Sequence, residues 1–312
     1  MNILIVGGGG LIGSGLTTYF LDNGHKVIVL DNFTSSLHNI LDKRATIITG
    51  SATSYSILNN IFSSFRPDYV FHLADNVVDK EGIYSFTDES DTYVSITNNL
   101  LRCINKTSIL HLFLGSSSEV YSSNNKNPIS ENSSVGINSY TGGLKYYSEE
   151  VVKFFSAAKK INYTFLRYFQ IYGNRRFINP KFDLVSYLVD TVVKKQGVFI
   201  VGPKVYTDVL SSQDAVNATA LVFEKIVSGE KIEAINIGSG SGIQILDLYN
   251  KITDYLQVKD LPVYKLKPRQ QTRSLVADNT LLKSLGWEQK NTLDTDLPSL
   301  VEFIKGLPHG RR

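Results

Sequence analysis

The sequence has few features of a secreted or membrane protein. Cys103 is its one cysteine, so no disulfide can form within the chain, and a reducing compartment is the simplest expectation. No apolar run approaches the roughly 20 residues that a membrane-spanning helix needs. The first run, at residues 3–6, is too short for a signal peptide. We therefore expect a cytoplasmic protein that binds no membrane.

The sequence also has little excess of either charge and few histidines or cysteines that could bind a metal. The 32 Lys and Arg residues nearly balance the 29 Asp and Glu residues, for a net charge of +3, and no long basic run is present. We therefore expect no nucleic-acid partner. The five histidines and the one cysteine do not cluster at the spacing of metal ligands, so we expect no metal site.

A glycine-rich stretch near the start is the most informative feature that is present. Three glycines, each three residues after the last, follow the apolar run at residues 3–6 and precede a helical pattern at residues 14–22. In the order strand, glycine turn, helix, such glycines allow a tight turn, close approach of a pyrophosphate, and close packing of helix on strand. The helix N-terminus then presents free N–H groups to the anion. The turn residues that we expect to contact a dinucleotide are Gly7, Gly10, Leu11, Ile12 and Gly13.

An acidic residue follows at the distance that a dinucleotide site requires. A second predicted strand, residues 26–30, ends at Asp31, whose carboxylate can accept both ribose hydroxyls of NAD. The next residues are Asn32 and Phe33 rather than an arginine, so a 2′-phosphate would meet the charge of Asp31 without a guanidinium partner. We therefore predict NAD rather than NADP. Four consecutive glycines can also form a merely flexible loop, but the strand, the helix and Asp31 favour the nucleotide site.

Short apolar segments alternate with helical patterns along the first half of the chain. Strands are predicted at residues 3–6, 26–30, 45–49, 69–74, 111–115 and 164–169, with helices at about 57–65 and 91–104. This alternation predicts an α/β fold with a doubly wound parallel sheet. Ligands of such sheets bind beyond the carboxyl ends of the strands. Three polar stretches are expected at that edge: residues 116–119, 138–145 and 170–173.

The alternation becomes irregular after residue 173. Short strands at 198–201 and 234–237 are separated by helical patterns at about 182–194, 213–226 and 245–256. We predict a Rossmann domain at residues 1–173 that binds NAD. We expect residues 174–312 to form mainly a smaller substrate-binding lobe, with some segments returning to the main sheet.

These motifs together resemble the extended short-chain dehydrogenase/reductase family, in particular its NAD-dependent nucleotide-sugar epimerases, dehydratases and decarboxylases. The resemblance spans most of the chain and is carried by residues 6–14, 30–32, 70–74, 116–121, 166–173, 236–240, 277–278 and 285–287. It implies a Rossmann fold, bound NAD, a nucleotide-diphosphate sugar as substrate, and a homodimer formed through helices near 91–104 and 145–159. It also implies further cofactor contacts at Ser51, Ala52, Leu73, Ala74 and Lys145.

The resemblance implies a reaction that begins with oxidation of the sugar at C4. The ketone acidifies the neighbouring C–H bonds, which allows epimerisation, dehydration or decarboxylation. In the family a tyrosine acts as base, and a lysine four residues later holds the nicotinamide ribose. The lysine's positive charge lowers the pKa of the tyrosine.

The sequence departs from the family at this tyrosine. Lys145 aligns with the active lysine, but Thr141 stands four residues before it and Tyr140 stands five before it. Side chains five residues apart on a helix point about 140° apart. Either Tyr140 reaches in from the turn before the helix, or Thr141 occupies its place. We favour Thr141.

The serine run supplies the remaining catalytic candidates. Ser117, Ser118 and Glu119 resemble the corresponding residues of nucleotide-sugar decarboxylases and 4,6-dehydratases. The resemblance implies that Ser117 hydrogen-bonds the sugar hydroxyl and that Glu119 acts as a base. Ser118 stands where a dehydratase carries an acidic aspartate. The alternatives are that Ser117 caps the strand end and that Glu119 is a solvated loop carboxylate.

The substrate side departs from the family as well. Gln170 stands in place of an asparagine that contacts the sugar–phosphate region, and Thr207 stands where an arginine usually precedes Asp208. Arg269 matches a later arginine of the family that holds the diphosphate. These departures leave two alternatives to the full reaction: a 4-dehydrogenase that stops at the ketone, and a non-catalytic protein that binds NAD or a sugar nucleotide.

Overall fold

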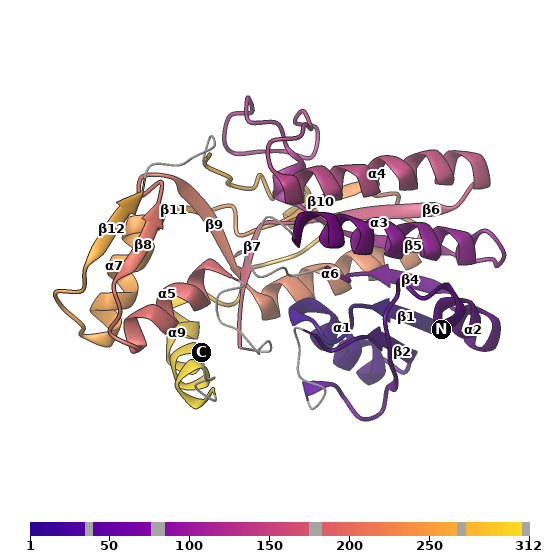
Figure 1. Cartoon of the computed structure of the whole chain (residues 1–312). Coiled ribbons are helices and arrows are strands. Elements are labelled where there is room, and N and C mark those ends of the chain that lie inside the picture. The colour runs from indigo at the N-terminus through magenta and orange to yellow at the C-terminus, as the bar shows by residue number, and fades with distance from the viewer. Residues whose placement is uncertain (35–39, 76–84, 175–182, 267–272, 308–312) are drawn as a thin grey trace.

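The fold is centred on a seven-stranded parallel sheet (Figure 1). The computed structural model describes residues 1–34, 40–75, 85–174, 183–266 and 273–307, and only the backbone for 85–90. The strands lie in the order β10-β6-β5-β4-β1-β2-β3. Their bounds are β1 (Asn2–Val6), β2 (Lys26–Asp31), β3 (Thr46–Thr49), β4 (Tyr69–His72), β5 (His111–Ser117), β6 (Asn162–Tyr168) and β10 (Ala234–Ile237). This confirms the predicted doubly wound sheet, whose direction of winding changes between β1 and β4.

Helices cover both faces of this sheet (Figure 1). One face packs against α1 (Leu11–Asp22) and α6 (Ser212–Val227), and the other packs against α2 (Tyr55–Phe65), α3 (Ser85–Ile104) and α4 (Tyr140–Lys159). Successive side chains of a strand point to opposite faces, so Ile3 and Ile5 join the first layer while Leu4 and Val6 join the second. Burial on both faces explains why this strand is continuously apolar.

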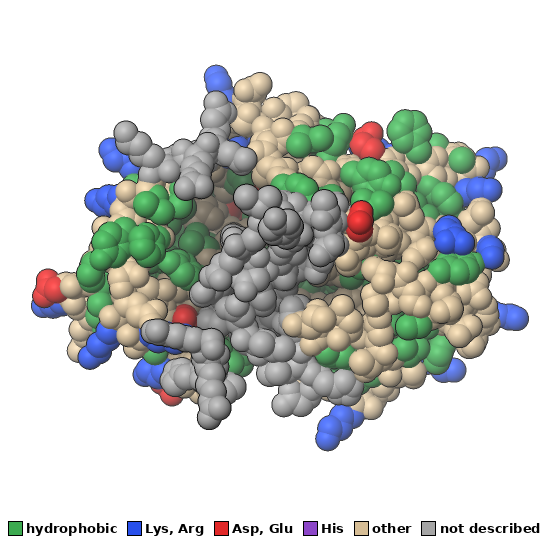
Figure 2. All heavy atoms as spheres, viewed as in Figure 1, with side chains coloured by type: hydrophobic (Ala, Val, Ile, Leu, Met, Phe, Trp, Pro, Cys, Tyr) green, Lys and Arg blue, Asp and Glu red, His purple; other side chains and the backbone are tan. Residues whose placement is uncertain are grey.

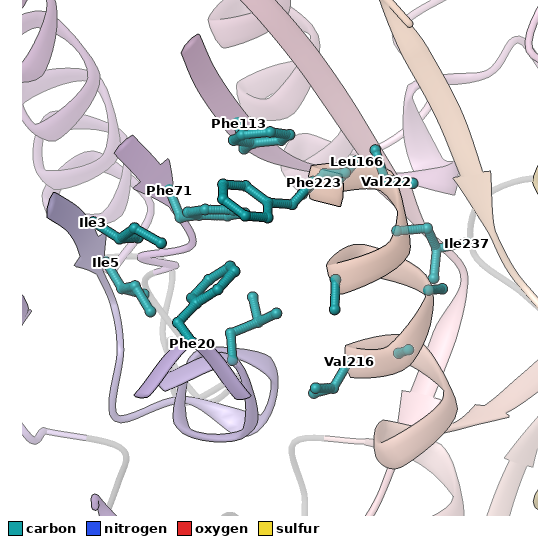
Figure 3. Packing of buried hydrophobic residues seen from close by; sticks show 14 of the residues in the cluster. Ile3, Ile5, Phe20, Phe71, Phe113, Leu166, Val216, Val222, Phe223 and Ile237 are labelled. Atoms are coloured by element: carbon teal, nitrogen blue, oxygen red, sulfur yellow. The ribbon is translucent and has the colours of Figure 1, made fainter. Parts of the chain in front are cut away.

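Aromatic side chains fill the layer between the sheet and the α1–α6 pair (Figure 3). The rings of Phe71 and Phe113 stack with centroids 4.4 Å apart, and Phe223 meets Phe20 edge to face at 4.8 Å. Such pairs contribute about 0.5–1.5 kcal/mol each beyond the area that they bury. This core holds α1, and therefore the glycine turn at its start, against β1 and β4.

A smaller lobe follows the main sheet and lies at the left of Figure 1. It contains a three-stranded sheet of β7 (Gln170–Tyr172), β9 (Tyr206–Ser211) and β11 (Gly242–Gln244), and a parallel pair of β8 (Val198–Val201) and β12 (Val263–Leu266). The helices α5 (Leu184–Val193), α7 (Ile245–Leu256) and α9 (Leu293–Gly306) enclose its own apolar cluster. The short helix α8 (Thr280–Ser284) contacts β10. Two segments beyond residue 174, β10 and α6, belong to the large layer instead.

None of the helices in the described ranges combines the length and apolar character needed to cross a membrane.

Candidate active site

The glycine turn is packed so closely against neighbouring backbone that a side chain at Gly7 or Gly13 would clash with it. Gly7 has a φ of +84°, and a Cβ placed on it would lie 2.4 Å from the backbone nitrogen of Ala74, just after β4. A Cβ on Gly13 would lie 2.6 Å from the carbonyl oxygen of Gly7. Gly10 is the N-cap of α1, no described side chain caps it, and the first turn has no acidic residue. The N–H groups at this helix start are therefore available to an anion, which fits a pyrophosphate.

Asp31 lies at the carboxyl end of β2, beside this turn. Its carboxylate accepts hydrogen bonds of 2.8 Å from the backbone N–H groups of Gly9 and Phe33, one on each oxygen. A carboxylate has about four acceptor positions, which fits bonds from the two hydroxyls of a ribose. The exposed Asn32 accepts bonds from the backbone N–H and the hydroxyl of Thr34.

The remaining predicted cofactor residues lie at the ends of β3 and β4. Ser51 lies within hydrogen-bond distance of the Thr53 hydroxyl, at 2.8 Å, and the Ala52 side chain packs into the core. The Leu73 N–H donates to the carbonyl of Val6 at 2.8 Å, which keeps the end of β4 against the glycine turn.

Lys145 lies on α4 with its ammonium buried at the ends of β4 and β5. Its Nζ is 3.2 Å from the Asp75 carboxylate, 3.3 Å from the Gly115 carbonyl oxygen, and 4.6 Å from the centroid of the Tyr93 ring. Burial alone would lower the pKa of Lys145, but Asp75 and Tyr93 raise it, and the net shift is upward. The lysine is therefore held as a cation. Neither Asp75 nor Tyr93 was predicted from the sequence.

A buried charge network supports the end of β5. The Ser116 hydroxyl donates to Glu149 at 2.6 Å, and Arg167 donates to the same carboxylate from Nε at 3.0 Å and from a terminal nitrogen at 2.7 Å. Arg167 also lies against Tyr121, whose hydroxyl donates to Asn236 at 2.6 Å. These bonds fix the backbone from which Ser117 projects.

Ser117 and Glu119 lie together at the carboxyl edge, as predicted. The Ser117 hydroxyl accepts a bond of 3.2 Å from the Glu119 N–H and so caps a short 3-10 helix at residues 118–120, while Ser118 is buried. The Glu119 carboxylate accepts a bond from the Ser139 hydroxyl, which in turn caps α4 through the Gly142 N–H at 3.0 Å. The strand-end cap is therefore present, and Glu119 is tied to the start of α4 rather than fully solvated.

The position at which α4 begins decides whether Tyr140 or Thr141 lies on the same helix face as Lys145. The helix begins at Tyr140 with Ser139 as its N-cap, so Tyr140 lies inside the helix and not in the turn before it. Tyr140 and Lys145 consequently point about 140° apart, while Thr141, one turn before Lys145, shares its face. Thr141, and not Tyr140, therefore lies on the helix face of Lys145. The roles of both residues stay predictions.

Two of the three predicted substrate residues lie in the smaller lobe. Gln170 on β7 pairs with Val209, and Thr207 on β9 pairs with Ile243. The neighbouring Asp208 is buried and accepts bonds from the backbone N–H groups of residues 239, 240 and 277, which fixes this strand. Arg269 lies outside the described residues.

Another arginine contacts the loop that carries Glu119. Arg273 donates to the carbonyl oxygens of Glu119, at 3.2 Å, and of Tyr121. It therefore joins the smaller lobe to this loop.

Comparison with known proteins identifies the family. Residues 3–238 match the model of the NAD dependent epimerase/dehydratase family. The chain belongs to this family. It is an NAD-dependent enzyme, and the glycine turn with Asp31 is the place that fits this cofactor.

Relatives match along almost the whole chain. UDP-glucose 4-epimerase of Lactobacillus helveticus is 26% identical over 99% of both chains, and that of Halalkalibacterium halodurans is 27% identical over 99% of this chain and 97% of the relative. The crystal structure of UDP-glucose 4-epimerase from Thermotoga maritima with UDP-glucose is 30% identical and covers 98% of this chain and 99% of that one, with a TM-score of 0.88. This chain is similar to these proteins in length, fold and sequence.

Proposed function

We propose that the protein epimerises a UDP-linked hexose at C4. The observation that carries the proposal is that α4, which carries Thr141 and Lys145, is bonded to the end of β5, which carries Ser117: Lys145 donates to the Gly115 carbonyl oxygen, and Ser139 at the helix start donates to Glu119. The names of the relatives support UDP-glucose and its C4 epimer as substrates. NAD, when bound, supplies the chemistry by accepting a hydride from C4 and returning it.

Each of these residues has a distinct role in the proposal. The hydroxyl of Ser117, fixed by the capping bond to Glu119, orients the C4 hydroxyl of the sugar. The Lys145 ammonium holds the nicotinamide ribose and stabilises negative charge on O4 as the proton leaves. Thr141 lies one turn before Lys145 and, in this proposal, contacts the C4 hydroxyl of the sugar.

The environment of Glu119 favours epimerisation over dehydration. A dehydration at C5 and C6 requires an acid for the departing hydroxyl as well as a base. In this chain the residue before Glu119 is a buried serine, and Glu119 itself is bonded to Ser139 at the helix start. We propose that Glu119 orders the start of α4 and contacts the sugar without abstracting its C5 proton.

The direct test is turnover of UDP-glucose and UDP-galactose, followed by NMR of the anomeric signals. The expected result is interconversion of the two sugars without a change in mass. A product lighter by one water would indicate dehydration instead, and one lighter by one carbon dioxide would indicate decarboxylation. Absorbance near 340 nm that accumulates together with a ketone would indicate a 4-dehydrogenase. Binding without any chemical change would leave a non-catalytic protein.

Substrate binding is proposed to involve the smaller lobe. Arg269 is proposed to contact the diphosphate, with Gln170 and Thr207 near the sugar–phosphate region. The expected result of Arg269→Ala is a higher KM for the UDP-sugar with little change in the Kd for NAD, because the cofactor residues lie in the large domain. An unchanged KM would remove Arg269 from the set.

We also propose a homodimer formed through α3 and α4 of each copy. These helices pack against each other on one face of the sheet, and Phe154 on α4 is 77% exposed. Hydrophobic side chains gather over this region in Figure 2. A large exposed apolar side chain on such a face favours association.

The dimer is tested by light scattering of Phe154→Glu. Phe199→Glu is the matched control, because Phe199 on β8 is 55% exposed but lies in the smaller lobe. We expect only the first substitution to give a monomer. A monomeric wild-type protein would contradict the proposal.

A further inference from the structure

Among the residues that the structure describes, a tyrosine outside α4 lies against Lys145. It is Tyr93 on the neighbouring helix α3, whose ring is 1% exposed and whose centroid lies 4.6 Å from the Lys145 Nζ. Tyr140 points away from Lys145 on their shared helix. The site therefore holds a buried phenol beside its lysine, but on a different element from the family's tyrosine.

The hydroxyl of Tyr93 is buried without a hydrogen-bond partner of regular geometry among the described residues. Leaving a buried hydroxyl unpaired costs about 1–3 kcal/mol. Such a group calls for a functional explanation when it lies at a site. Lys145 and Ser148 are near enough to the phenol to lower its pKa, although neither meets that geometry.

The surroundings of this phenol are polar and titratable. Lys145 faces it from α4, and Asp75 and His72 face it from the end of β4, with the His72 and Tyr93 ring centroids 5.8 Å apart. Burial lowers the pKa of His72 to about 3, with a further contribution from Lys145, so this ring is neutral near pH 7. Thr97 lies within hydrogen-bond distance of both His72, at 3.2 Å, and Ser148, at 3.1 Å, and so connects α3 to β4 and α4.

We propose that Tyr93 is the phenol partner of Lys145 and holds the proton that Lys145 exchanges with the sugar hydroxyl. The inference rests on the proposed C4 chemistry. As the hydride leaves C4, the O4 proton passes to Nζ while a proton of the ammonium passes to the Tyr93 phenolate oxygen. Lys145 thus remains an ammonium and Tyr93 becomes a neutral phenol. The return of the hydride reverses both transfers, so no proton is gained or lost. Tyr93 acts through Lys145 and is a positioning residue.

The charges around Tyr93 predict an alkaline pH dependence. Burial raises the pKa of Tyr93, the Lys145 ammonium lowers it, and Asp75 raises it, with a net upward shift. Because the phenolate accepts the proton, turnover rises with pH up to and beyond the ordinary pKa of a tyrosine, about 10.

The test compares Tyr93→Phe with Tyr55→Phe. Phenylalanine at 93 keeps the ring next to Lys145 and removes only the unpaired hydroxyl, so the variant should be at least as stable as the wild type. Tyr55 on α2 is a matched control, because it also contacts cations: its hydroxyl accepts a bond from Lys106 at 2.7 Å, and Arg102 lies 4.1 Å from its ring centroid.

We expect Tyr93→Phe to lower kcat about 100-fold or more and to abolish the alkaline rise, with KM unchanged. Adding Thr141→Tyr to this variant should restore part of kcat by placing a phenol one turn before Lys145. Tyr55→Phe should behave as the wild type. A Tyr93→Phe variant with wild-type kcat and pH profile would overturn the inference.

A spectroscopic titration separates this inference from the proposed function. The absorbance change near 295 nm, taken as the wild type minus Tyr93→Phe, reports ionisation of this one phenol without substrate. Replacing Lys145 by Met in both proteins should raise its midpoint by about one pH unit or more, because the ammonium lowers the phenol's pKa. An unchanged midpoint would refute the pairing. Absence of UDP-sugar turnover in the wild type would instead refute the proposed function.

Discussion

Replacing Gly7 by Ala should weaken NAD binding and destabilise the fold, and Gly24 provides a matched control. Both glycines have positive φ, +84° for Gly7 and +75° for Gly24. No described atom lies within 4 Å of a Cβ placed on Gly24, whereas the Cβ of Gly7 would lie 2.4 Å from the Ala74 nitrogen and 2.6 Å from the carbonyl carbon of Leu73. The two substitutions therefore share the dihedral strain and differ in the clash.

The two contributions can be given magnitudes. Holding an alanine at positive φ costs about 1–2 kcal/mol at either position. The clash at Gly7 involves backbone atoms, so no side-chain rotation relieves it, and the turn and the end of β4 must move apart until the contact exceeds the 3.0 Å that Cβ atoms rarely go below. Overpacking of this kind costs about 1–3 kcal/mol more. Gly7→Ala should therefore lose about 2–5 kcal/mol of unfolding free energy, and Gly24→Ala about 1–2.

Urea unfolding and calorimetric titration of cofactor-free protein with NAD measure both effects. We expect Gly7→Ala to bind NAD at least about tenfold more weakly, because opening the contact from 2.4 Å to 3.0 Å displaces the turn by about 0.6 Å and loses at least about 1.4 kcal/mol of pyrophosphate contacts. Gly24→Ala should bind NAD as the wild type does. Equal affinity for NAD and equal unfolding midpoints for the two variants would refute the predicted clash at Gly7.

Three further predictions concern buried charge, acid stability and the cofactor. Glu149→Leu leaves the guanidinium of Arg167 buried without its carboxylate and should cost about 3–5 kcal/mol in urea unfolding, while Lys153→Met, which breaks an exposed pair with Glu150, should cost under about 1 kcal/mol. Burial lowers the pKa of His111 to about 4, below the value of about 6.5 in the unfolded chain. The neutral imidazole therefore stabilises the fold above about pH 6.5, and this stabilisation is lost as the pH falls. By pH 5 the wild type should lose about 2 kcal/mol more unfolding free energy than His111→Gln. Asp31→Ser should weaken NAD binding more than NADP binding in the same calorimetric assay, because only the unphosphorylated ribose has both hydroxyls to donate.

The central sheet could be predicted from the sequence because its strands are buried on both faces. Such strands are continuous apolar runs, and the glycine turn and Asp31 fix the ends of the first two. The smaller lobe gives weaker signals. The strand predicted at 198–201 is β8, in which buried and exposed residues alternate, whereas β12 was not predicted because most of it is exposed. Helix α9 was not predicted because Pro298 lies inside it, and a proline usually ends a helical pattern.

In the candidate site, some features follow from local sequence signals, and others depend on contacts between residues far apart in the sequence. The N-cap role of Ser139 is a local signal that could have been used: serine is a preferred N-cap, and reading it so would have started α4 at Tyr140. The approach of Arg167 to Glu149, of Arg273 to the Glu119 loop, and of Asp75 to Lys145 depends on packing between elements far apart in sequence. Periodicity along a single sequence carries no information on such contacts.

The proposed partnership of Tyr93 with Lys145 shows what this limit means for function. In the family's arrangement the tyrosine and the lysine lie one turn apart on one helix, so the backbone itself sets their distance and a spacing motif finds them. Here the phenol comes from α3 and the lysine from α4, so their distance depends on how the two helices pack on each other and on the sheet. Thr97, which joins α3 to both His72 and Ser148, acts directly on that packing. A motif search along this chain therefore reports a missing tyrosine although a phenol lies beside the lysine, because the pair exists in space and not in the local sequence.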